Sequence, residues 1–417
     1  MSFGYTVLGF GAGILDSFTP YISRAKPDGS SSTDGNSYGI HIAFDDNTKG
    51  VFVVVWRNND DTQIKGVVGT HDAGSIIFGT PVVIYSQGDL VTQPRMDFDK
   101  STAGKFVVQY NLTERHNAGN PTFQVGTISN TGTNATISMG SASTMPYGPS
   151  HPNSTWAGAQ GDVAVSKDGS YVYFVAYDQS SANQGRMSRW NLDSTSVSSW
   201  NYIGEFHANG RAQVLETCMD DNANDSVIVL YTQNGANLMA RLVSPNSTGV
   251  DREVTTNGAE AHGLTFNPNT TTDALFYYRD QANSDYPTVR MGRWSGNACT
   301  FGTAVVLEST AMAGQITGHF DFGTAKDQAV VIWAVSNIGR AARLEIDGTA
   351  ITVAETKGAG SINDGVEVSS LSWEGRGGLD FDPQDLGKFI YPFRHYPGDG
   401  ETDHGVPFIA CGSIPSG

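Results

Sequence analysis

The sequence predicts an all-β protein, a seven-bladed β-propeller of four-stranded blades whose ring is closed by an N-terminal strand. Three observations lead to this fold class. One strand–turn–strand phrase recurs seven times along the 417 residues. The composition is rich in Gly, Ser, Thr and Asn, which favours turns and short strands over long amphipathic helices. The last copy of the phrase lacks one strand, which another part of the chain must supply.

The phrase is clearest at residues 40–56, which read IHIAFDDNTKGVFVVVW. A short alternating run ends on Phe44, an Asp/Asn/Gly turn follows, and a β-branched run ends on Trp56. Alternation of apolar and polar residues predicts a half-buried strand, and the polar break predicts a hairpin. The phrase therefore predicts the first two strands of one blade.

Six further copies repeat this phrase, each with an apolar anchor at the end of its first strand. An aromatic residue follows each anchor by about twelve residues. The anchors lie roughly 47 to 67 residues apart, which is typical of multi-strand repeats rather than of heptads or short solenoid turns. The anchors are Phe44, Phe98, Val165, Met219 (or Cys218), Phe266, Phe322 and Phe381, and the aromatics are Trp56, Tyr110, Tyr177, Tyr231, Tyr278, Trp333 and Phe393.

A third and a fourth strand complete each repeat. Residues 78–85 (FGTPVVIY) close the first repeat, and residues 301–307 (FGTAVVL) close the fifth with nearly the same sequence. Both segments are therefore predicted as outer strands. The longest interval between anchors contains residues 131–155, which are rich in Ser, Gly and Pro. This segment is predicted to be an exposed loop insertion.

The seventh repeat supplies three strands, at 379–382, 388–393 and 406–410, and no closing strand follows them. The missing strand can come from the N-terminal part of the chain, either from residues 5–10 or from residues 18–24. Such an exchange joins the last blade to the first and removes exposed sheet edges.

Two regions follow from this interpretation. Residues 1–37 are expected to hold a docking segment, the closing strand and a linker, and residues 38–417 are expected to form the propeller. A ring of six or eight blades is the alternative, because irregular repeats are difficult to count.

The chain is acidic. It carries 25 Lys and Arg against 42 Asp and Glu, a formal net charge of −17. Such a charge disfavours binding to nucleic acid and to anionic membranes and favours solubility. No stretch reaches the ~18 apolar residues of a membrane-spanning helix. The three cysteines, Cys218, Cys299 and Cys411, show no CxxC spacing and are predicted to be small core residues rather than disulfide partners or zinc ligands.

Several short motifs imitate reactive sites without the context that the chemistry requires. The glycine-rich stretch 9–13 lacks the helix that a dinucleotide-binding loop needs, and Ser37 of G-x-S-x-G lacks the preceding strand of a nucleophile elbow. The acidic loop 220–225 is open to two interpretations, a weak calcium loop or a solvated turn, of which the turn is favoured. We expect no cofactor, no metal site and no catalytic residue.

Two groups of residues are placed near the central channel by their distance from the anchors. Three residues that directly precede an anchor are carboxylates, which can lie near a cation or be solvated; the spacing favours solvated acids. Three histidines fall three or four residues before an anchor and can converge at one rim of the ring. The carboxylates are Asp97, Asp321 and Asp380, and the histidines are His41, His262 and His319.

Aromatic side chains in predicted loops are the candidate contacts for a glycan or a partner protein, because an aromatic ring stacks on a sugar face. These residues are Tyr147, Trp156 and Trp200. A sialidase-like site needs convergent arginines, whereas Arg95 and Arg290 fall in predicted strands and no arginine triad is visible. A propeller glycosidase is therefore the least favoured function.

The repeat sequences resemble those of a known group of proteins. The phrases FGTPVVIY and IAFDDNTKGVFVVVWRN, with a G-x-V-G-T strand, are similar to the propeller repeats of tailed-bacteriophage virion proteins, often described as tail, tail-fibre or virion structural proteins. The apolar start YTVLGFG is similar to the start of such proteins. The resemblance covers most of residues 39–417. It implies a non-enzymatic role in assembly or adhesion and carries no catalytic residues.

We therefore expect a non-enzymatic structural component of the phage particle, in the tail or its fibres, present in several copies and bound to other virion structural proteins. Assembly is expected through the propeller surface and through the N-terminal residues Tyr5, Val7, Leu8 and Phe10. The alternative is an adhesin module that binds a host receptor or glycan. Neither nucleic acid binding nor membrane insertion is expected.

Overall fold

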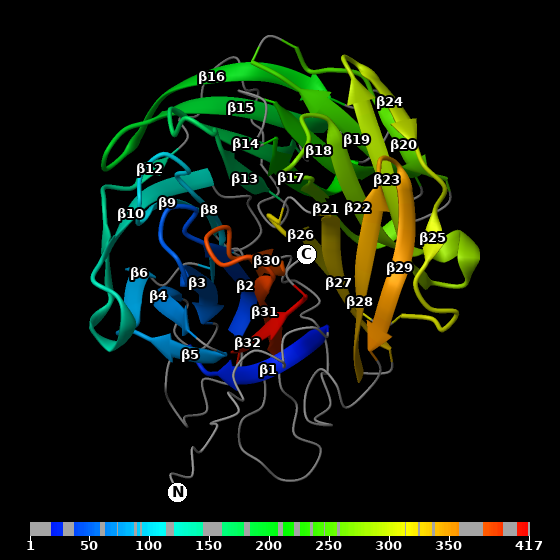
Figure 1. Ribbon diagram of the computed structural model, residues 1–417. Coiled ribbons are helices and arrows are strands. Elements are labelled where there is room, and N and C mark those ends of the chain that lie inside the picture. Colours follow the sequence, from blue (N-terminus) through cyan, green and yellow to red (C-terminus); the bar gives the residue numbers. More distant parts are fainter. Residues whose placement is uncertain are drawn as a thin grey trace, which may run out of the picture.

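The computed structural model describes residues 18–415 with interruptions. The interruptions are 28–36, 59–62, 73, 87–89, 92–93, 114–120, 145–160, 179–183, 207–211, 221–225, 234–236, 246, 257–258, 313, 324–325, 336–337, 358–377 and 395–406. Within the described part, seven antiparallel sheets stand around a common axis as the blades of a ring (Figure 1). The predicted seven-bladed β-propeller is confirmed.

The first three blades follow one another along the chain. Blade 1 holds β2 (Ser37–Phe44), β3 (Val51–Asn58), β4 (Gln63–Asp72), β5 (Ser75–Phe78) and β6 (Val82–Tyr85). Blade 2 holds β7 (Leu90–Val91), β8 (Arg95–Phe98), β9 (Lys105–Thr113), β10 (Pro121–Ser129), β11 (Thr136–Met139) and β12 (Ser143–Thr144). Blade 3 holds β13 (Asp162–Val165), β14 (Tyr171–Asp178), β15 (Gln184–Leu192) and β16 (Val197–Phe206).

The other four blades complete the ring. Blade 4 holds β17 (Ala212–Met219), β18 (Val227–Gln233), β19 (Asn237–Val243) and β20 (Arg252–Thr255). Blade 5 holds β21 (Ala259–Phe266), β22 (Asp273–Asp280), β23 (Tyr286–Ser295), β24 (Ala298–Phe301) and β25 (Val305–Val306). Blade 6 holds β26 (Ile316–Phe320), β27 (Asp327–Val335), β28 (Ile338–Asp347) and β29 (Ala350–Lys357). Blade 7 holds β30 (Asp380–Phe381), β31 (Lys388–Arg394), β32 (Pro407–Ser413) and β1 (Thr19–Ala25).

Helical structure among the described residues is confined to two short 3₁₀ turns, η1 (Gly132–Asn134) and η2 (Gln281–Asn283). A helix with the length and apolarity needed to cross a membrane does not occur in the part of the chain that the structure describes.

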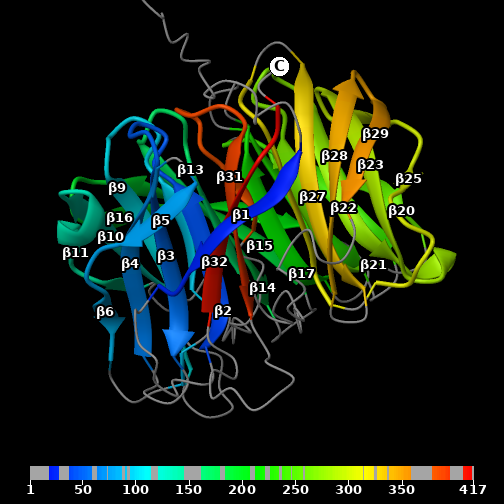
Figure 2. The same ribbon diagram turned by 60° about the horizontal axis from the view of Figure 1, so that its bottom comes forward.

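The ring closes in blade 7, where the N-terminal strand β1 pairs antiparallel with β32 as the outermost strand (Figure 2). Phe18 is 1% exposed and packs into the apolar cluster of this blade, and the Ser23 hydroxyl donates to the carbonyl of Gly74 in blade 1 at 2.5 Å. The predicted closure by residues 18–24 is confirmed, and the alternative strand 5–10 lies outside the described residues.

The core lies between blades rather than inside them. The described residues form seven apolar clusters, one between each pair of consecutive blades. In β3, for example, Val53 and Val55 pack against blade 2, whereas the alternate residues Val54 and Trp56 pack against blade 7. A strand that is buried on both faces has no need of polar residues, which explains the continuous apolar run before each aromatic.

The two predicted closing strands that begin with the sequence FGT, residues 78–85 and 301–307, are each broken into two shorter strands. Residues 78–85 contain the end of β5 and then β6, which both pair with β4, and residues 301–307 contain the end of β24 and then β25. The break lies at Gly79 and at Gly302, which approach the next blade. A Cβ on Gly79 would lie 2.2 Å from the carbonyl oxygen of Ala135, and a Cβ on Gly302 would lie 2.0 Å from that of Thr349.

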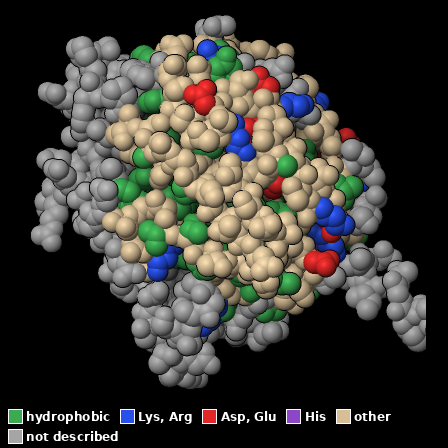
Figure 3. All heavy atoms as spheres, turned by 90° about the vertical axis from the view of Figure 1, so that its left-hand side faces the viewer, with side chains coloured by type: hydrophobic (Ala, Val, Ile, Leu, Met, Phe, Trp, Pro, Cys, Tyr) green, Lys and Arg blue, Asp and Glu red, His purple; other side chains and the backbone are tan. Residues whose placement is uncertain are grey.

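The predicted loop insertion at residues 131–155 is wrong for its first part. Residues 136–139 and 143–144 form β11 and β12, which pair with β10 as the outer edge of blade 2. The side chain of Ile137 is buried between exposed or half-buried neighbours, a weak alternation that the Ser- and Gly-rich composition conceals. Residues 145–155 lie outside the described residues. Figure 3 looks onto this side of the ring.

The anchor of repeat six is Phe320 and not Phe322. Phe320 pairs with Ala329, whereas in blade 1 Phe44 pairs with Phe52, so the hairpin of blade 6 is one residue longer. The predicted anchor lay two residues too far along the chain, because the sequence Phe320-Asp321-Phe322 offers an aromatic residue at both positions. As a consequence His319, not Asp321, is the residue of blade 6 that precedes the anchor.

Three aspartates that follow anchors join neighbouring blades. Oδ1 of Asp45 accepts the N–H of Asn47 in its own turn, and Oδ2 accepts the N–H of Gly104 in blade 2 at 2.8 Å. Asp382 and Asp321 accept N–H groups of glycines in the same way: Gly50 at 2.7 Å and Gly387 at 2.8 Å. Gly50, Gly104 and Gly387 have φ near +70°, a conformation that favours glycine.

Candidate functional site

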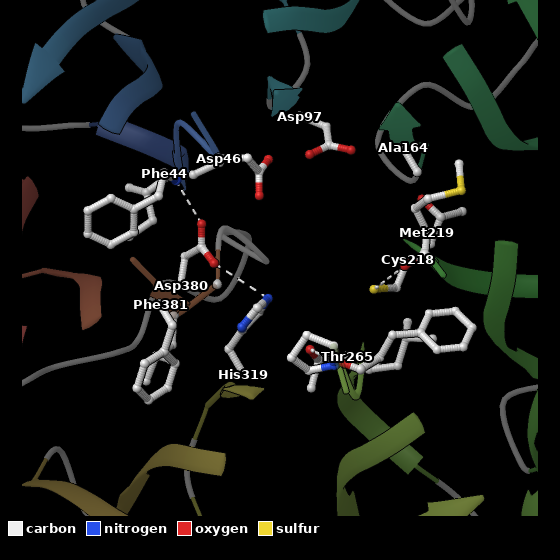
Figure 4. A pocket seen from close by; sticks show the side chains of 18 of the residues that line it. Phe44, Asp46, Asp97, Ala164, Cys218, Met219, Thr265, His319, Asp380 and Phe381 are labelled. Carbon is white, nitrogen blue, oxygen red and sulfur yellow. Dashed lines mark hydrogen bonds and ion pairs between the residues drawn. The ribbon is translucent and has the colours of Figure 1, made fainter. Parts of the chain in front are cut away.

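A cavity of about 170 Å³ lies in the central channel and is lined by residues from all seven blades (Figure 4). The innermost strands β2, β8, β13, β17, β21, β26 and β30 form its wall. Because side chains alternate along a strand, the residue before each anchor faces the channel while the anchor packs between blades. These channel residues are Ala43, Asp97, Ala164, Cys218, Thr265, His319 and Asp380.

Two further tiers complete the lining. His41 and Asp162 stand three residues before their anchors, one alternation farther along the same strands. Asp46, Lys100 and Phe322 stand two residues after their anchors, in the hairpins at the other end of the cavity.

Asp380 and His319 face each other across the boundary between blades 6 and 7. Nε2 of His319 lies 3.4 Å from Oδ1 of Asp380, and Nδ1 lies 2.8 Å from the carbonyl oxygen of Phe320. Oδ2 of Asp380 accepts the N–H of Phe44 in blade 1 at 2.7 Å. Burial raises the pKa of Asp380, and the His319 side chain opposes that rise. This pair therefore connects three consecutive blades.

Asp97 and Asp162 also accept backbone donors of the following blade. Oδ2 of Asp97 accepts the N–H of Val165 at 2.7 Å. Oδ2 of Asp162 accepts the N–H of Thr217 at 2.7 Å and its hydroxyl at 3.1 Å. Burial raises the pKa of Asp162, against the attraction of Arg95, whose Nε lies 4.0 Å from Oδ1.

His41 stays neutral at ordinary pH. Burial, followed by the charge of Arg95, lowers its pKa to about 3. Its Nδ1 is buried without a hydrogen-bond partner among the described residues. A neutral imidazole in this place contributes packing and a dipole rather than charge.

Charge is distributed unevenly around the cavity. Asp46, Asp97, Asp380 and His319 come from blades 1, 2, 7 and 6, and all four side chains point into one half of the space (Figure 4). In blades 3 to 5 the residues that precede the anchors are uncharged: Ala164, Cys218 and Thr265. Asp162 of blade 3 adds a carboxylate on that side, one alternation farther along its strand.

The structure brings together some of the residues predicted for the channel and not others. Asp97, Asp380, His41 and His319 line the cavity. The prediction was wrong for Asp321, which is buried and accepts the N–H of Gly387, because the anchor of blade 6 was displaced. His262 is buried and does not line the cavity.

Most of the predicted contact residues lie outside the described part of the chain. These are Tyr5, Val7, Leu8, Phe10, Tyr147 and Trp156. Trp200 belongs to β16, but its side chain is not among those described. Sequence reasoning missed Lys100, Asp162 and Phe322 as cavity residues, although their fixed distance from the anchors is a signal that could have found them.

Arg95 and Arg290 do not converge. Arg95 of blade 2 lies beside Asp162 of blade 3, next to the channel. Arg290 lies in the outer part of blade 5, where its Nε donates to the carbonyl of Gly302 at 2.8 Å. Among the described residues, no group of three His, Cys, Asp or Glu side chains could hold a metal ion. Cys218, Cys299 and Cys411 lie in strands, as predicted, and no disulfide joins them. Cys411 is buried, whereas Cys218 and Cys299 are only half-buried.

Comparison with known proteins bears on the fold. No protein-family model and no curated protein matches the sequence. AofleA from Arthrobotrys oligospora is similar in structure, with a TM-score of 0.50, 10% identity, and 83% of this chain and 94% of that chain covered. A structure of NanB plus Optactamide has a TM-score of 0.50, 10% identity, and coverages of 96% and 70%. The molecule is a β-propeller.

A third similar structure is Chaetomium thermophilum Sqt1 bound to the N-terminus of the ribosomal protein L10. The match has a TM-score of 0.48 and 10% identity, and it includes 92% of this chain and 88% of that chain. At such identities the likeness concerns the fold alone. The activities and partners of these propellers do not transfer, and the expected virion role stays a prediction.

Proposed function

We propose that this propeller is a non-enzymatic structural component of a bacteriophage virion, in the tail or its fibres, that works by binding other proteins. The phage assignment rests on the resemblance of the repeat sequences, such as FGTPVVIY and IAFDDNTKGVFVVVWRN, to those of tailed-bacteriophage virion proteins. The non-enzymatic assignment rests on one structural observation, the way in which the channel carboxylates are used.

Asp97, Asp162 and Asp380 each accept a backbone N–H from the next blade. A general acid or base must instead be free to exchange a proton with a substrate within hydrogen-bond reach. His319 is held in the same manner, because its two ring nitrogens face a carbonyl and a carboxylate oxygen. These groups support a role for the channel as a rigid hub, which favours binding through the outer surfaces.

The location of the chain tests this proposal. Purified phage particles are analysed by mass spectrometry and by immunogold labelling with an antibody against the propeller. We expect the chain in intact particles, in several copies at the tail. A chain that is expressed during infection but absent from purified particles would contradict the proposal.

A second candidate function, binding of a host glycan, is favoured by the cavity itself. Its volume of about 170 Å³ suits a ligand the size of one sugar ring or smaller. Carboxylates on one side can accept hydrogen bonds from hydroxyl groups, and Tyr277 and Phe322 offer apolar surface.

Saturation-transfer NMR with a panel of monosaccharides separates the two candidates. Binding that is lost in Phe322→Ala but kept in the distant control Val306→Ala would support the glycan function. No transfer to any sugar in the wild-type chain would reject it and leave the structural role.

A further inference from the structure

We propose that the outer wall of blades 1 and 2 docks against a second copy of this chain. This uncharged wall consists of β5 and β6 of blade 1 and β11 and β12 of blade 2. The inference rests on the proposed function, since it specifies how copies of the propeller contact one another. Three independent features of the wall support it: its lack of charge, its open strand edges and its continuity across the blade boundary.

The lack of charge is unusual for this chain. Residues 73–88 and 117–161, which include the whole wall, contain no Asp, Glu, Lys or Arg, although the chain carries 67 such residues (25 and 42) and a net charge of −17. Uncharged side chains and backbone dominate this side of the molecule in Figure 3. Two anionic copies repel each other wherever their charged faces meet, so the uncharged wall is the face on which they approach at least electrostatic cost.

The wall also presents unprotected strand edges. Among the described strands, β5 and β6 pair only with β4, and they leave Ile77 and Val83 43% and 50% exposed. Natural proteins usually guard such edges with charged residues, because an open edge pairs readily with another strand. The edges of blades 4 and 6 are guarded in this way, by Arg252 and Glu253 in β20 and by the Lys357–Glu355 ion pair in β29. Blade 1 lacks this protection, as does blade 5, whose outer strands β24 and β25 also carry no charge. The wall differs from the edge of blade 5 in extending over two blades.

The wall is continuous across the boundary between the two blades. The N–H of Thr80 donates to the carbonyl of Ala135 at 3.1 Å, and the N–H of Gly132 donates to the hydroxyl of Thr70 at 3.1 Å. On its other side the wall borders β1, which packs on β5 and leaves Ile22 38% exposed. The wall therefore offers an extended surface rather than isolated apolar residues.

A second copy suits this surface better than a partner of another chemistry. The wall has no charge to recognise an anionic or a cationic partner, and its open edges can pair antiparallel with the same edges of another copy. Such a contact is two-fold symmetric, with β5 of each copy facing the wall of the other.

Self-association of the purified full-length chain tests the proposal. Sedimentation equilibrium is measured on the wild type, on Ile77→Glu/Val83→Glu, and on the control Val250→Glu/Val306→Glu, which changes two comparably exposed valines of blades 4 and 5. We expect a concentration-dependent dimer in the wild type and the control, and at least a roughly tenfold weaker dimer in the wall variant, because each interface would bury unpaired carboxylates. Raising the salt concentration from about 0.05 to 0.5 M should strengthen the dimer, since it screens the repulsion between copies.

Hydrogen–deuterium exchange provides a second readout that does not depend on a variant. Amides of residues 75–85 should exchange more slowly as the wild-type concentration rises. A monomer at all concentrations, an equal loss in the control, or a dimer lost on deletion of residues 1–15 but kept in the wall variant would each overturn the proposal. Any of these results leaves the virion assignment standing, because that assignment is tested by particle composition.

Discussion

At the scale of the residue, the most telling positions are the buried acids that follow the anchors. In the sequence they are ordinary turn residues, since Asp favours turns by bonding its own backbone. In the folded ring Asp382 also joins two blades, because Oδ2 accepts the N–H of Gly50 in blade 1 while Oδ1 accepts the N–H of Gln384 in its own turn. Burial raises the pKa of this carboxyl although both N–H groups favour its charged form, so the desolvation of the charge outweighs these bonds.

Asp382→Ala is predicted to destabilise the protein by roughly 1–3 kcal/mol, because the buried N–H of Gly50 and the half-buried N–H of Gln384 lose their acceptor. Asp382→Asn keeps one acceptor oxygen for Gly50 and removes the buried charge, but its NH2 group cannot accept the N–H of Gln384. We therefore expect a smaller loss than for Asp382→Ala, about 1 kcal/mol. Because the folded pKa is raised, the cost of the charge appears as the pH rises through that value, and the asparagine variant gains most at neutral pH. Urea unfolding at pH 7 measures both variants; equal losses would contradict this interpretation.

A second prediction concerns pH. Burial lowers the pKa of His41 from 6.5 to about 3. Between these two pH values the unfolded chain binds a proton on His41 and the folded chain does not. The free energy of unfolding should therefore fall as the pH drops from 6.5 towards 3, by at most about 1.4 kcal/mol per pH unit from this group.

The raised pKa values of Asp162 and Asp380 act in the opposite sense, because the folded state binds their protons earlier as the pH falls. The comparison of wild type with His41→Gln isolates the histidine. We expect the variant to lose less stability than the wild type between pH 7 and pH 5 in thermal unfolding. Parallel pH curves would show that His41 titrates normally in the folded protein.

At the scale of the element, the recurrence of FGT is explained by contact between blades. The N–H groups of Gly79 and Gly302 bond to the third strand of their own blade, while the missing side chain admits a carbonyl of the next blade. The same arrangement occurs at Gly140, where a Cβ would lie 2.0 Å from the carbonyl oxygen of Thr195. A glycine at this point therefore sets how closely the outer edges of two blades approach.

Gly79→Ala should destabilise the protein by roughly 1–3 kcal/mol, since the new methyl group displaces the backbone of blade 2. The control Thr80→Ala, in the same turn and exposed, should change stability by less than about 0.5 kcal/mol. Denaturant midpoints of the two variants check this. A neutral Gly79→Ala would mean that the blades separate freely at this edge.

At the scale of the whole molecule, stability depends on closing the ring. Every blade has an apolar cluster on both faces, and the cluster between blades 6 and 7 includes Phe18, the residue before β1. Closure thus joins residues near the two ends of the described chain. The long sequence separation of these contacts is an entropic cost that the buried apolar surface must offset.

Phe18→Ala is predicted to cost about 3–5 kcal/mol, the usual range for emptying a buried phenylalanine site. Ile22→Ala changes a neighbouring residue of the same strand that is 38% exposed, and should cost less than about 1 kcal/mol. Thermal and urea unfolding of both variants test the role of the closing strand. A similar small loss in both would mean that β1 contributes little to the ring.

The sequence by itself predicted the repeat, seven blades rather than six or eight, and the first two strands of each blade. It assigned the closing strand to the N-terminal part of the chain, and the structure decided for residues 18–24 over residues 5–10. The sequence could make these predictions because hydrophobic periodicity and turn residues are local properties that each strand carries alone. Only the tertiary structure decided which residues meet in the channel. The first strand of blade 6 ends at Phe320, two residues earlier than predicted, so His319 and not Asp321 faces the channel. The apolar pattern alone does not distinguish Phe320 from Phe322 as the last residue of that strand. The partnership of Asp380 with Phe44, far away in sequence, exists only because the ring closes.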